Sequence, residues 1–429
     1  MKHKVLFFVE FDSPISISWN DLEVGNPGIG GTQYTTLCLA KELSKLANYD
    51  IQIVCRSLLD LDAPIQVLQL TIEQAVDFAE SNSSILVYRP TINFEPELLR
   101  KLSATSASVI AWAHVGPSQK TLRLLSSMSS IKRVVALGER ELISWFDNPV
   151  INKSVLIRNG HHVPAQKSNY KVDHNAITYI GSLVPQKGFH LLAEVWPEIV
   201  AKHPQLYLNV VGSGNLYSND TNLGSLGIAA PLYEEMILKN LGPSLSSVNF
   251  LGKLGGAAKN SLVATSYVGI INPSGNTENC PLSALDFQSL SVPVLSARKY
   301  GVIDTVKDGE TGILFRNYKD LPRYLDRLIQ NPGLRGSLAK HCLPFIEDRF
   351  DFSKVVNEWE MLFSNLEISH AVKRVNFSEA VNFSEFLTIA NGKFIGNLNF
   401  SIPWFSLIEF NTLIKKISKS IISYLRKFR

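Results

Sequence analysis

Short apolar runs rich in β-branched residues recur along the chain, and segments of helical length with one apolar face separate them. In the N-terminal part the runs are 5–9, 51–54, 85–88, 109–113, 134–137 and 155–157. After a break they resume at 177–180, 206–211, 248–251, 268–271 and 292–295. Buried parallel strands that alternate with crossover helices produce this pattern. The chain is therefore predicted to be an α/β protein built from two similar halves.

The break between the two halves is the polar stretch 164–171, which is typical of a linker. We place one Rossmann-like unit at 1–167 and a second at 168–350, because 429 residues exceed what a single core usually supports. Residues 367–429 break the alternation and are expected to be an addition to the second unit. Ligands bind beyond the carboxyl ends of the strands in open parallel sheets, so two facing sheets predict a site in a central cleft.

Composition narrows the class of protein. Hydrophobic residues make up 45% and charged residues 19%, which suits packed cores and excludes a disordered chain. A net charge of +4 is too small to predict nucleic acid as a partner. The apolar run at the N-terminus ends at Glu10 after five residues, so we expect a first strand and not a signal peptide. No apolar stretch reaches about 18 residues, so a membrane-spanning helix is not expected.

Cysteine usage points to a reducing compartment. The four cysteines form no CxxC pair and show no metal-ligand spacing with histidine; they are Cys38, Cys55, Cys280 and Cys342. We therefore expect a cytoplasmic protein with neither disulfides nor a structural metal.

Glycine-containing loops follow three of the predicted strands. Gly30 and Gly31 precede a helical pattern, and such a loop either holds an anion at the helix N-terminus or is a flexible turn. Lys187 follows the strand 177–180 and is either a phosphate ligand or a solvated side chain. Gly212 and Gly214 follow another strand, where a simple turn explains them equally well.

The segment 272–282 lies between a strand and a helix that reaches about residue 290. Pro281 suits the first turn of that helix because its missing N–H has no helical partner there. Glu278 then lies just before the helix and Asp286 roughly one and a half turns inside it. Carboxylates in these places can accept hydrogen bonds from sugar or ribose hydroxyls; alternatively, Glu278 caps the helix and Asp286 lies on a solvated face.

In their order and spacing these segments resemble the retaining GT-B glycosyltransferases of family four, across roughly residues 1–366. The matching positions are Gly30-Gly31, Asn159-Gly160, Gly181, Lys187-Gly188, Gly212, Gly214, Pro273-Ser274, Glu278, Asp286, Pro293-Val294 and 308–312. The resemblance implies a GT-B fold, with 1–167 on the acceptor side and 168–350 binding the nucleotide sugar. Residues 351–366 would be a crossover helix that returns to the first domain, and 367–429 a helical extension.

The resemblance also implies roles for individual residues. Glu278 would hold hydroxyls of the donor sugar, and Lys187 the diphosphate. His114 matches the family's histidine near the transferred sugar, although the residue by itself favours a structural histidine. These three form the expected catalytic set. The further donor-binding residues are Gly30, Gly31, Ser182, Gly212, Asn279, Cys280, Pro281, Leu282 and Asp286, with Asp286 on the ribose.

Two positions depart from the family pattern. Ser182 stands where the family commonly has arginine, so one diphosphate cation is missing and Lys253 or Arg298 would have to replace it. Asp286 replaces a glutamate and is one methylene shorter. The acidic motif at 60–62 matches a metal-binding pattern of another glycosyltransferase class, but one such match is expected by chance and we interpret it as a solvated loop. No metal or cofactor is expected; the donor is a UDP- or GDP-linked sugar.

The last residues, Leu407 to Arg429, form a basic amphipathic pattern. Such a helix either lies on an anionic membrane surface, which we favour, or docks on the protein's own core or on a second subunit. The expected protein is a retaining hexosyltransferase, peripheral on the inner face of the membrane. Its acceptor would be a glycan or lipid-linked glycan of cell-surface polysaccharide or lipopolysaccharide biosynthesis. The alternative is a catalytically silent GT-B module that binds nucleotide or glycan in a membrane assembly.

Overall fold

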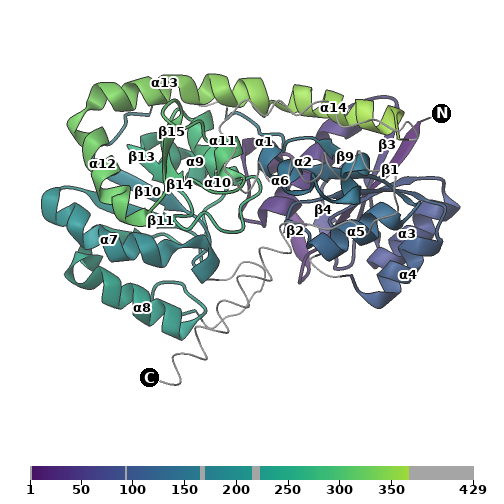
Figure 1. Ribbon diagram of the computed structural model, residues 1–429, viewed down its shortest axis with the longest axis horizontal. Helices are drawn as coiled ribbons and strands as arrows, with labels where there is room; N and C mark the ends of the chain where they lie inside the picture. Colours follow the sequence, from purple (N-terminus) through teal and green to yellow (C-terminus); the bar gives the residue numbers. More distant parts are fainter. Residues whose placement is uncertain (1, 92–93, 165–169, 215–222, 367–429) are drawn as a thin grey trace.

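The computed structural model describes residues 2–91, 94–164, 170–214 and 223–366. Within these residues the chain forms two large parallel sheets, one in each half, with helices packed around them (Figure 1). The predicted extension at 367–429, including the basic pattern from Leu407 to Arg429, lies outside the described residues. No helix in the described part of the chain is both long enough and apolar enough to cross a membrane.

The first sheet has seven strands in the order β5-β3-β1-β6-β7-β8-β9. Their bounds are His3–Val9 (β1), Tyr49–Cys55 (β3), Gln66–Gln69 (β5), Ile85–Tyr88 (β6), Ser108–Trp112 (β7), Ile131–Ala136 (β8) and Ser154–Leu156 (β9). All six strands predicted for this half are confirmed. The edge strand β5 was missed because its residues are only partly buried and it begins and ends with glutamine.

The second sheet has six strands in the order β12-β11-β10-β13-β14-β15. Their bounds are Ala176–Ile180 (β10), Tyr207–Val211 (β11), Val248–Phe250 (β12), Val268–Ile270 (β13), Val294–Ala297 (β14) and Gly312–Phe315 (β15). The five predicted strands are confirmed, and β15 is an addition. Because β10 lies between β11 and β13, the loops that leave the carboxyl ends of these three strands are neighbours.

Helices connect the strands in both halves. In the first half they are Asp21–Val24 (α1), Gly31–Ser44 (α2), Ile72–Ser81 (α3), Pro96–Ala104 (α4), Gln119–Ser127 (α5), Glu139–Ser144 (α6) and the 3-10 helix Pro149–Lys153 (η1). In the second half they are Phe189–Lys202 (α7), Pro231–Leu241 (α8), Gly256–Thr265 (α9), Leu282–Ser289 (α10), Val302–Thr305 (α11), Leu321–Gln330 (α12) and Pro332–Arg349 (α13). Three further 3-10 helices are Pro185–Lys187 (η2), Gly242–Ser247 (η3) and Tyr318–Asp320 (η4).

The last described helix, Phe352–Ser364 (α14), packs on the first sheet although it follows the second in sequence (Figure 1). Trp359 is fully buried there, with its ring 5.0 Å from that of Trp112 and 6.4 Å from that of Phe7. The chain thus crosses between the halves twice. The two crossing segments, one at His161 and one at Phe350 and Asp351, lie side by side. His161 N donates a hydrogen bond to Phe350 O over 2.7 Å, and His161 forms a β-bridge with Asp351.

The acidic motif at 60–62 is solvent-exposed as expected, but its first two residues belong to a strand and not to a loop. Leu59–Leu61 is strand β4, which pairs with Ile15–Ile17 (β2) in a small sheet. The carboxylate of Asp60 accepts a hydrogen bond from Ser16 Oγ over 2.8 Å, and that of Asp62 accepts one from Trp19 N. These carboxylates therefore tie the small sheet together. The described residues contain no group of three or more His, Cys, Asp or Glu residues able to hold a metal ion.

Candidate functional site

Glu278 and Lys187 form an ion pair where the loops after β13 and β10 meet. Lys187 Nζ lies 2.7 Å from Glu278 Oε1, and the two side chains are 22% and 11% exposed. Asn272 Nδ2 donates to the same Oε1 over 2.8 Å. Among the described residues none bonds to Oε2, which leaves one carboxylate oxygen for a ligand hydroxyl. Glu278 is thus not a helix cap, and Lys187 is not merely solvated.

Asn272 organises the loop that carries Glu278. Its Oδ1 accepts a hydrogen bond from Ser274 Oγ over 2.7 Å, and its Nδ2 also donates to Asn276 O over 2.8 Å. Asn272 and Thr277 have positive φ angles of 23° and 60°, which are uncommon outside glycine. Such backbone is held only by surrounding contacts and is concentrated at binding sites. Sequence reasoning gave Asn272 no role, although an asparagine directly after a strand was a usable signal.

Two glycines allow the neighbouring loops to approach one another. Gly188 has φ 70°, and a Cβ there would come within 2.6 Å of Ser274 N. Gly212 has φ 144°, and a Cβ there would overlap Gly181 O. Gly212 N also donates to Gly252 O over 2.8 Å. The loops after β10, β11, β12 and β13 therefore meet at one edge of the second sheet, and Ser182 lies on that edge.

Asp286 is held by a buried lysine. Lys259 Nζ on α9 lies 2.7 Å from Asp286 Oδ2 on α10, and the side chains are 5% and 13% exposed. The alternative that Asp286 lies on a solvated face is therefore wrong. Lys259 was missed, because nothing in the sequence distinguishes it from a surface lysine on an amphipathic helix.

The first half brings the N-terminus of α2 to the same place. Gly30 is its N-cap residue and Gly31 its first residue, so these glycines are not a flexible turn. A Cβ on Gly31 would lie 3.2 Å from the Leu282 side chain at the start of α10. Two helix N-termini, each with a partial positive charge and free N–H groups, thus face one another. Pro281 is the N-cap of α10 and not in its first turn as predicted, since its ψ of 105° is extended.

Asn279 connects the site to the first half. Its Nδ2 donates to Glu141 Oε1 on α6 over 2.6 Å, and a Cβ on Gly116 would lie 3.8 Å from its amide. Glu141 was missed, because a contact between distant halves leaves no local sequence pattern. Next to Asn279, burial raises the pKa of the Cys280 thiol to about 12, so this thiol is protonated and unreactive at neutral pH.

His114 lies in the loop after β7, two residues before Gly116. Burial lowers the pKa of its imidazole to about 3, and the nearby Arg89 guanidinium acts in the same direction. The ring is therefore neutral, and it packs 4.3 Å from that of Trp112. Its Nε2 is buried and has no partner among the described residues. This loop approaches Asn279 and hence the neighbourhood of Glu278.

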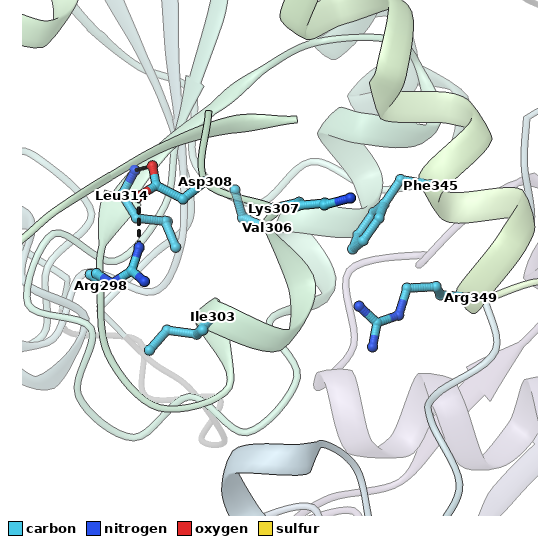
Figure 2. Close-up of a pocket in the computed structure, with 8 residues that line it drawn as sticks. All are labelled: Arg298, Ile303, Val306, Lys307, Asp308, Leu314, Phe345 and Arg349. Atoms are coloured by element: carbon cyan, nitrogen blue, oxygen red, sulfur yellow. Dashed lines mark hydrogen bonds and ion pairs between the residues drawn. The ribbon is translucent and has the colours of Figure 1, made fainter. Parts of the chain in front are cut away.

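The two cations considered as replacements for the missing arginine differ in their surroundings. Arg298 Nη1 pairs with Asp308 Oδ2 over 2.6 Å. It lines a separate cavity of about 330 Å³, bordered on the other side by Phe345 and Arg349 (Figure 2). Lys253 directly follows Gly252, is exposed, and has no ion-pair partner among the described residues. Lys253 is therefore the cation available at the edge where Ser182 lies.

Two Rossmann-like sheets joined in this way define a GT-B fold, and solved structures agree. A glycosyltransferase from Rickettsia africae superposes with a TM-score of 0.64 at 15% identity, covering 86% of this chain and all 100% of that one. The Anabaena protein HepE, solved with UDP and glucose, gives 0.61 at 15% identity, covering 85% of this chain and 100% of HepE. The predicted fold class is confirmed.

The sequence comparisons relate the second half of the chain to a known family. Residues 164–342 match the family model "Glycosyl transferases group 1", which is the group of proteins that the motifs of this chain resemble. An uncharacterized glycosyltransferase of Haemophilus influenzae is 26% identical over 247 residues, which are 56% of this chain and 64% of that protein. The capsular polysaccharide biosynthesis glycosyltransferase CapM of Staphylococcus aureus is 24% identical over 194 residues, 45% of this chain and 46% of CapM. The matched region spans about half to two thirds of these relatives.

Proposed function

We propose that this protein is a glycosyltransferase that moves a hexose from a nucleotide sugar to an acceptor with retention of configuration. The observation that carries the proposal is the Lys187–Glu278 pair at the carboxyl edge of the second sheet. It lies in the loops whose motifs resemble the family's donor site. A hydroxyl-binding carboxylate beside a phosphate-binding lysine suits a sugar linked to a diphosphate.

In the proposed mechanism the largest catalytic contribution is stabilisation of the leaving diphosphate. Lys187 and Lys253 supply positive charge, and the N-termini of α2 and α10 supply N–H donors. Ser182 donates one hydrogen bond without a full charge. Neutral His114 offers Nε2 to the transferred sugar. The acceptor attacks from the face that the nucleotide leaves, without a protein nucleophile or a metal ion.

Glu278 has a separate role in this mechanism. Its Oε1 is occupied by Lys187 and Asn272, so Oε2 accepts from hydroxyls of the sugar. Fixing those hydroxyls holds the anomeric carbon in place as the bond to the diphosphate breaks. Asp286 would reach the ribose only if it shared its carboxylate between the ribose and Lys259.

The wider setting of the reaction is proposed from the relatives. HepE binds UDP and glucose, which makes UDP-sugars the first donors to test. CapM is named for capsular polysaccharide biosynthesis, which supports a glycan or lipid-linked glycan as acceptor. Attachment to the inner face of the membrane through residues 407–429 is part of the same proposal. A chain truncated after residue 399 that still sediments fully with anionic vesicles would contradict it.

The decisive experiment presents labelled UDP-, GDP- and ADP-sugars to the protein and follows both binding and product. We expect one donor to raise the thermal stability by mass action and to be hydrolysed or transferred. Lys187→Ala should lose turnover, whereas the matched control Lys239→Ala, on the exposed surface of α8, should not.

The missing arginine at Ser182 favours one rival, a catalytically silent GT-B module that binds nucleotide or glycan. A donor that binds but is neither hydrolysed nor transferred at saturating concentration would support that rival and exclude the enzyme.

A further inference from the structure

A contact between the two halves lies directly beside Glu278. Glu141 Oε1 on α6 accepts a hydrogen bond from Asn279 Nδ2 over 2.6 Å, and its Oε2 accepts one from Leu137 N over 2.9 Å. Asn279 is covalently joined to Glu278. The carboxyl group of Glu141 therefore links the backbone at the end of β8 to the segment that carries Glu278.

A second carboxyl group makes the reciprocal contact. Asp304 on α11, in the second half, accepts a hydrogen bond at Oδ2 from Arg140 N on α6 over 2.9 Å. Gly301, directly before α11, donates its N–H to Glu278 O over 2.8 Å. The backbone of Glu278 is thus held on one side through Asn279 and on the other through Gly301. Asn279 bonds directly to α6, and Gly301 precedes the helix whose Asp304 bonds to α6.

We propose that Glu141 is a positioning residue of the donor site. It holds Asn279, and through it the backbone of Glu278, at a fixed place relative to the first half. Donor binding at Glu278 is then coupled to the relative position of the two halves. This inference rests on the proposed function, because it concerns the same site.

The charges around the contact make it sensitive to pH. Glu141 and Asp304 are only 8% and 6% exposed, and a buried carboxylate without an ion pair is costly. Burial raises the pKa of Glu141 to about 8, and the Asp304 carboxylate acts in the same direction. Burial raises the pKa of Asp304 to about 7. Asp304 also faces Glu139 and Arg140 on α6, Arg158 after β9 and the Cys280 thiol, and Arg349 at the end of α13 pairs with Glu139.

The protonation states of Glu141 and Asp304 determine whether a rise in pH strengthens or weakens the contact between the two halves. Well below pH 7 both carboxyl groups are protonated. The protonated Glu141 can donate a hydrogen bond to the side chain of Asn279 when that amide presents its oxygen in place of its nitrogen. Above pH 8 both are ionised and repel each other. Raising the pH should therefore weaken the contact and, with it, donor binding. Glu141→Gln keeps the neutral form at every pH.

The experiment uses the full chain with UDP-glucose as the probe and measures its dissociation constant below pH 7 and above pH 8. We expect Glu141→Ala to weaken binding about tenfold at low pH, because it removes two buried hydrogen bonds. Wild type should lose affinity above pH 8, whereas Glu141→Gln should not. Glu97→Gln on the exposed surface of α4 is the matched control and should follow wild type.

A second measurement separates this inference from the proposed function. Small-angle X-ray scattering without ligand should show wild type expanding above pH 8 and Glu141→Gln keeping its radius of gyration. An unchanged wild-type radius, or identical pH profiles for wild type and Glu141→Gln, overturns the positioning role, even if Glu141→Ala fails to fold. If UDP-glucose does not bind at all, the proposed donor is wrong. The scattering result then tests by itself whether the contact between Glu141 and Asn279 holds the two halves together.

Discussion

At the scale of single residues, the main feature of the site is that the hydrogen-bond partners of Glu278 in the described part of the chain occupy only one of its two carboxylate oxygens. Glu278 shares Oε1 between Lys187 and Asn272, and its Oε2 has no hydrogen-bond partner among the described residues. Such an arrangement fixes the direction in which the remaining oxygen points before any ligand arrives, so less ordering is required on binding.

Glu278→Ala should abolish transfer while the protein stays folded. The substitution removes the proposed hydroxyl acceptor and leaves Lys187 Nζ without its partner, at a cost of about 1–3 kcal/mol in the free energy of unfolding. Product formation from a labelled donor and urea unfolding measure the two effects. Near-normal turnover would remove Glu278 from the mechanism.

Lys253→Ala should weaken UDP binding about fivefold, because an exposed charge contributes roughly 1 kcal/mol to phosphate binding. Ser182→Arg should restore the affinity by supplying a cation on the same edge. Calorimetric titration with UDP measures both, and Lys239→Ala serves as the control for loss of a surface charge. Full affinity in Lys253→Ala would mean that the diphosphate lies elsewhere.

The residues of this site were only partly accessible from the sequence. Glu278, Lys187 and Gly31 were predicted because each follows a strand or begins a helix within a recognisable motif. Glu141 and Lys259 were not, because their partners lie in another element and no local spacing reports such contacts.

At the scale of elements, buried strands were predictable because both faces of a central strand are apolar. The strands β2, β4 and β5 were missed, since they are short or partly exposed and alternate with polar residues. The helix α14 was expected from its resemblance to the family, and the structure shows what holds it. Its apolar face completes the core of the first sheet around Trp359.

Trp359→Ala should lower the free energy of unfolding by about 3–5 kcal/mol, the usual cost of truncating a buried tryptophan. Met361→Ala on the same helix is the control, since Met361 is 58% exposed. Urea unfolding compares the two variants. Equal free energies of unfolding for the two variants would show that α14 does not pack on the first half in solution.

At the scale of the whole molecule, the buried carboxyls predict a stability that depends on pH. The pKa of Glu141 is raised from 4.5 to about 8 on folding, and that of Asp304 from 3.8 to about 7. At a pH between the unfolded and the folded pKa of each group, the unfolded chain binds fewer protons than the folded protein. The stabilisation that the two protonated carboxyl groups give to the folded state is therefore complete at low pH and is lost as the pH rises.

Relative to Glu141→Gln, wild type should accordingly lose stability as the pH rises from 4.5 to 8. Burial lowers the pKa values of His114 and His161 to about 3 and 4, so these two residues make the stability rise with pH. Because both proteins contain them, their effect cancels when wild type is compared with Glu141→Gln. Melting temperatures of both proteins across this range provide the measurement. A constant difference between them would contradict the raised pKa of Glu141.

The paired crossings at His161 and Asp351 have a mechanical consequence. A single connection would let the two halves twist about one another, but two connections that lie side by side and are hydrogen-bonded must bend together. Relative motion is then reduced to a hinge whose axis runs through these crossings. Opening on that hinge would separate Gly31 from Leu282 and Glu141 from Asn279 in a single movement. For the nucleotide-sugar donor that we propose, this one opening movement would serve both entry and release.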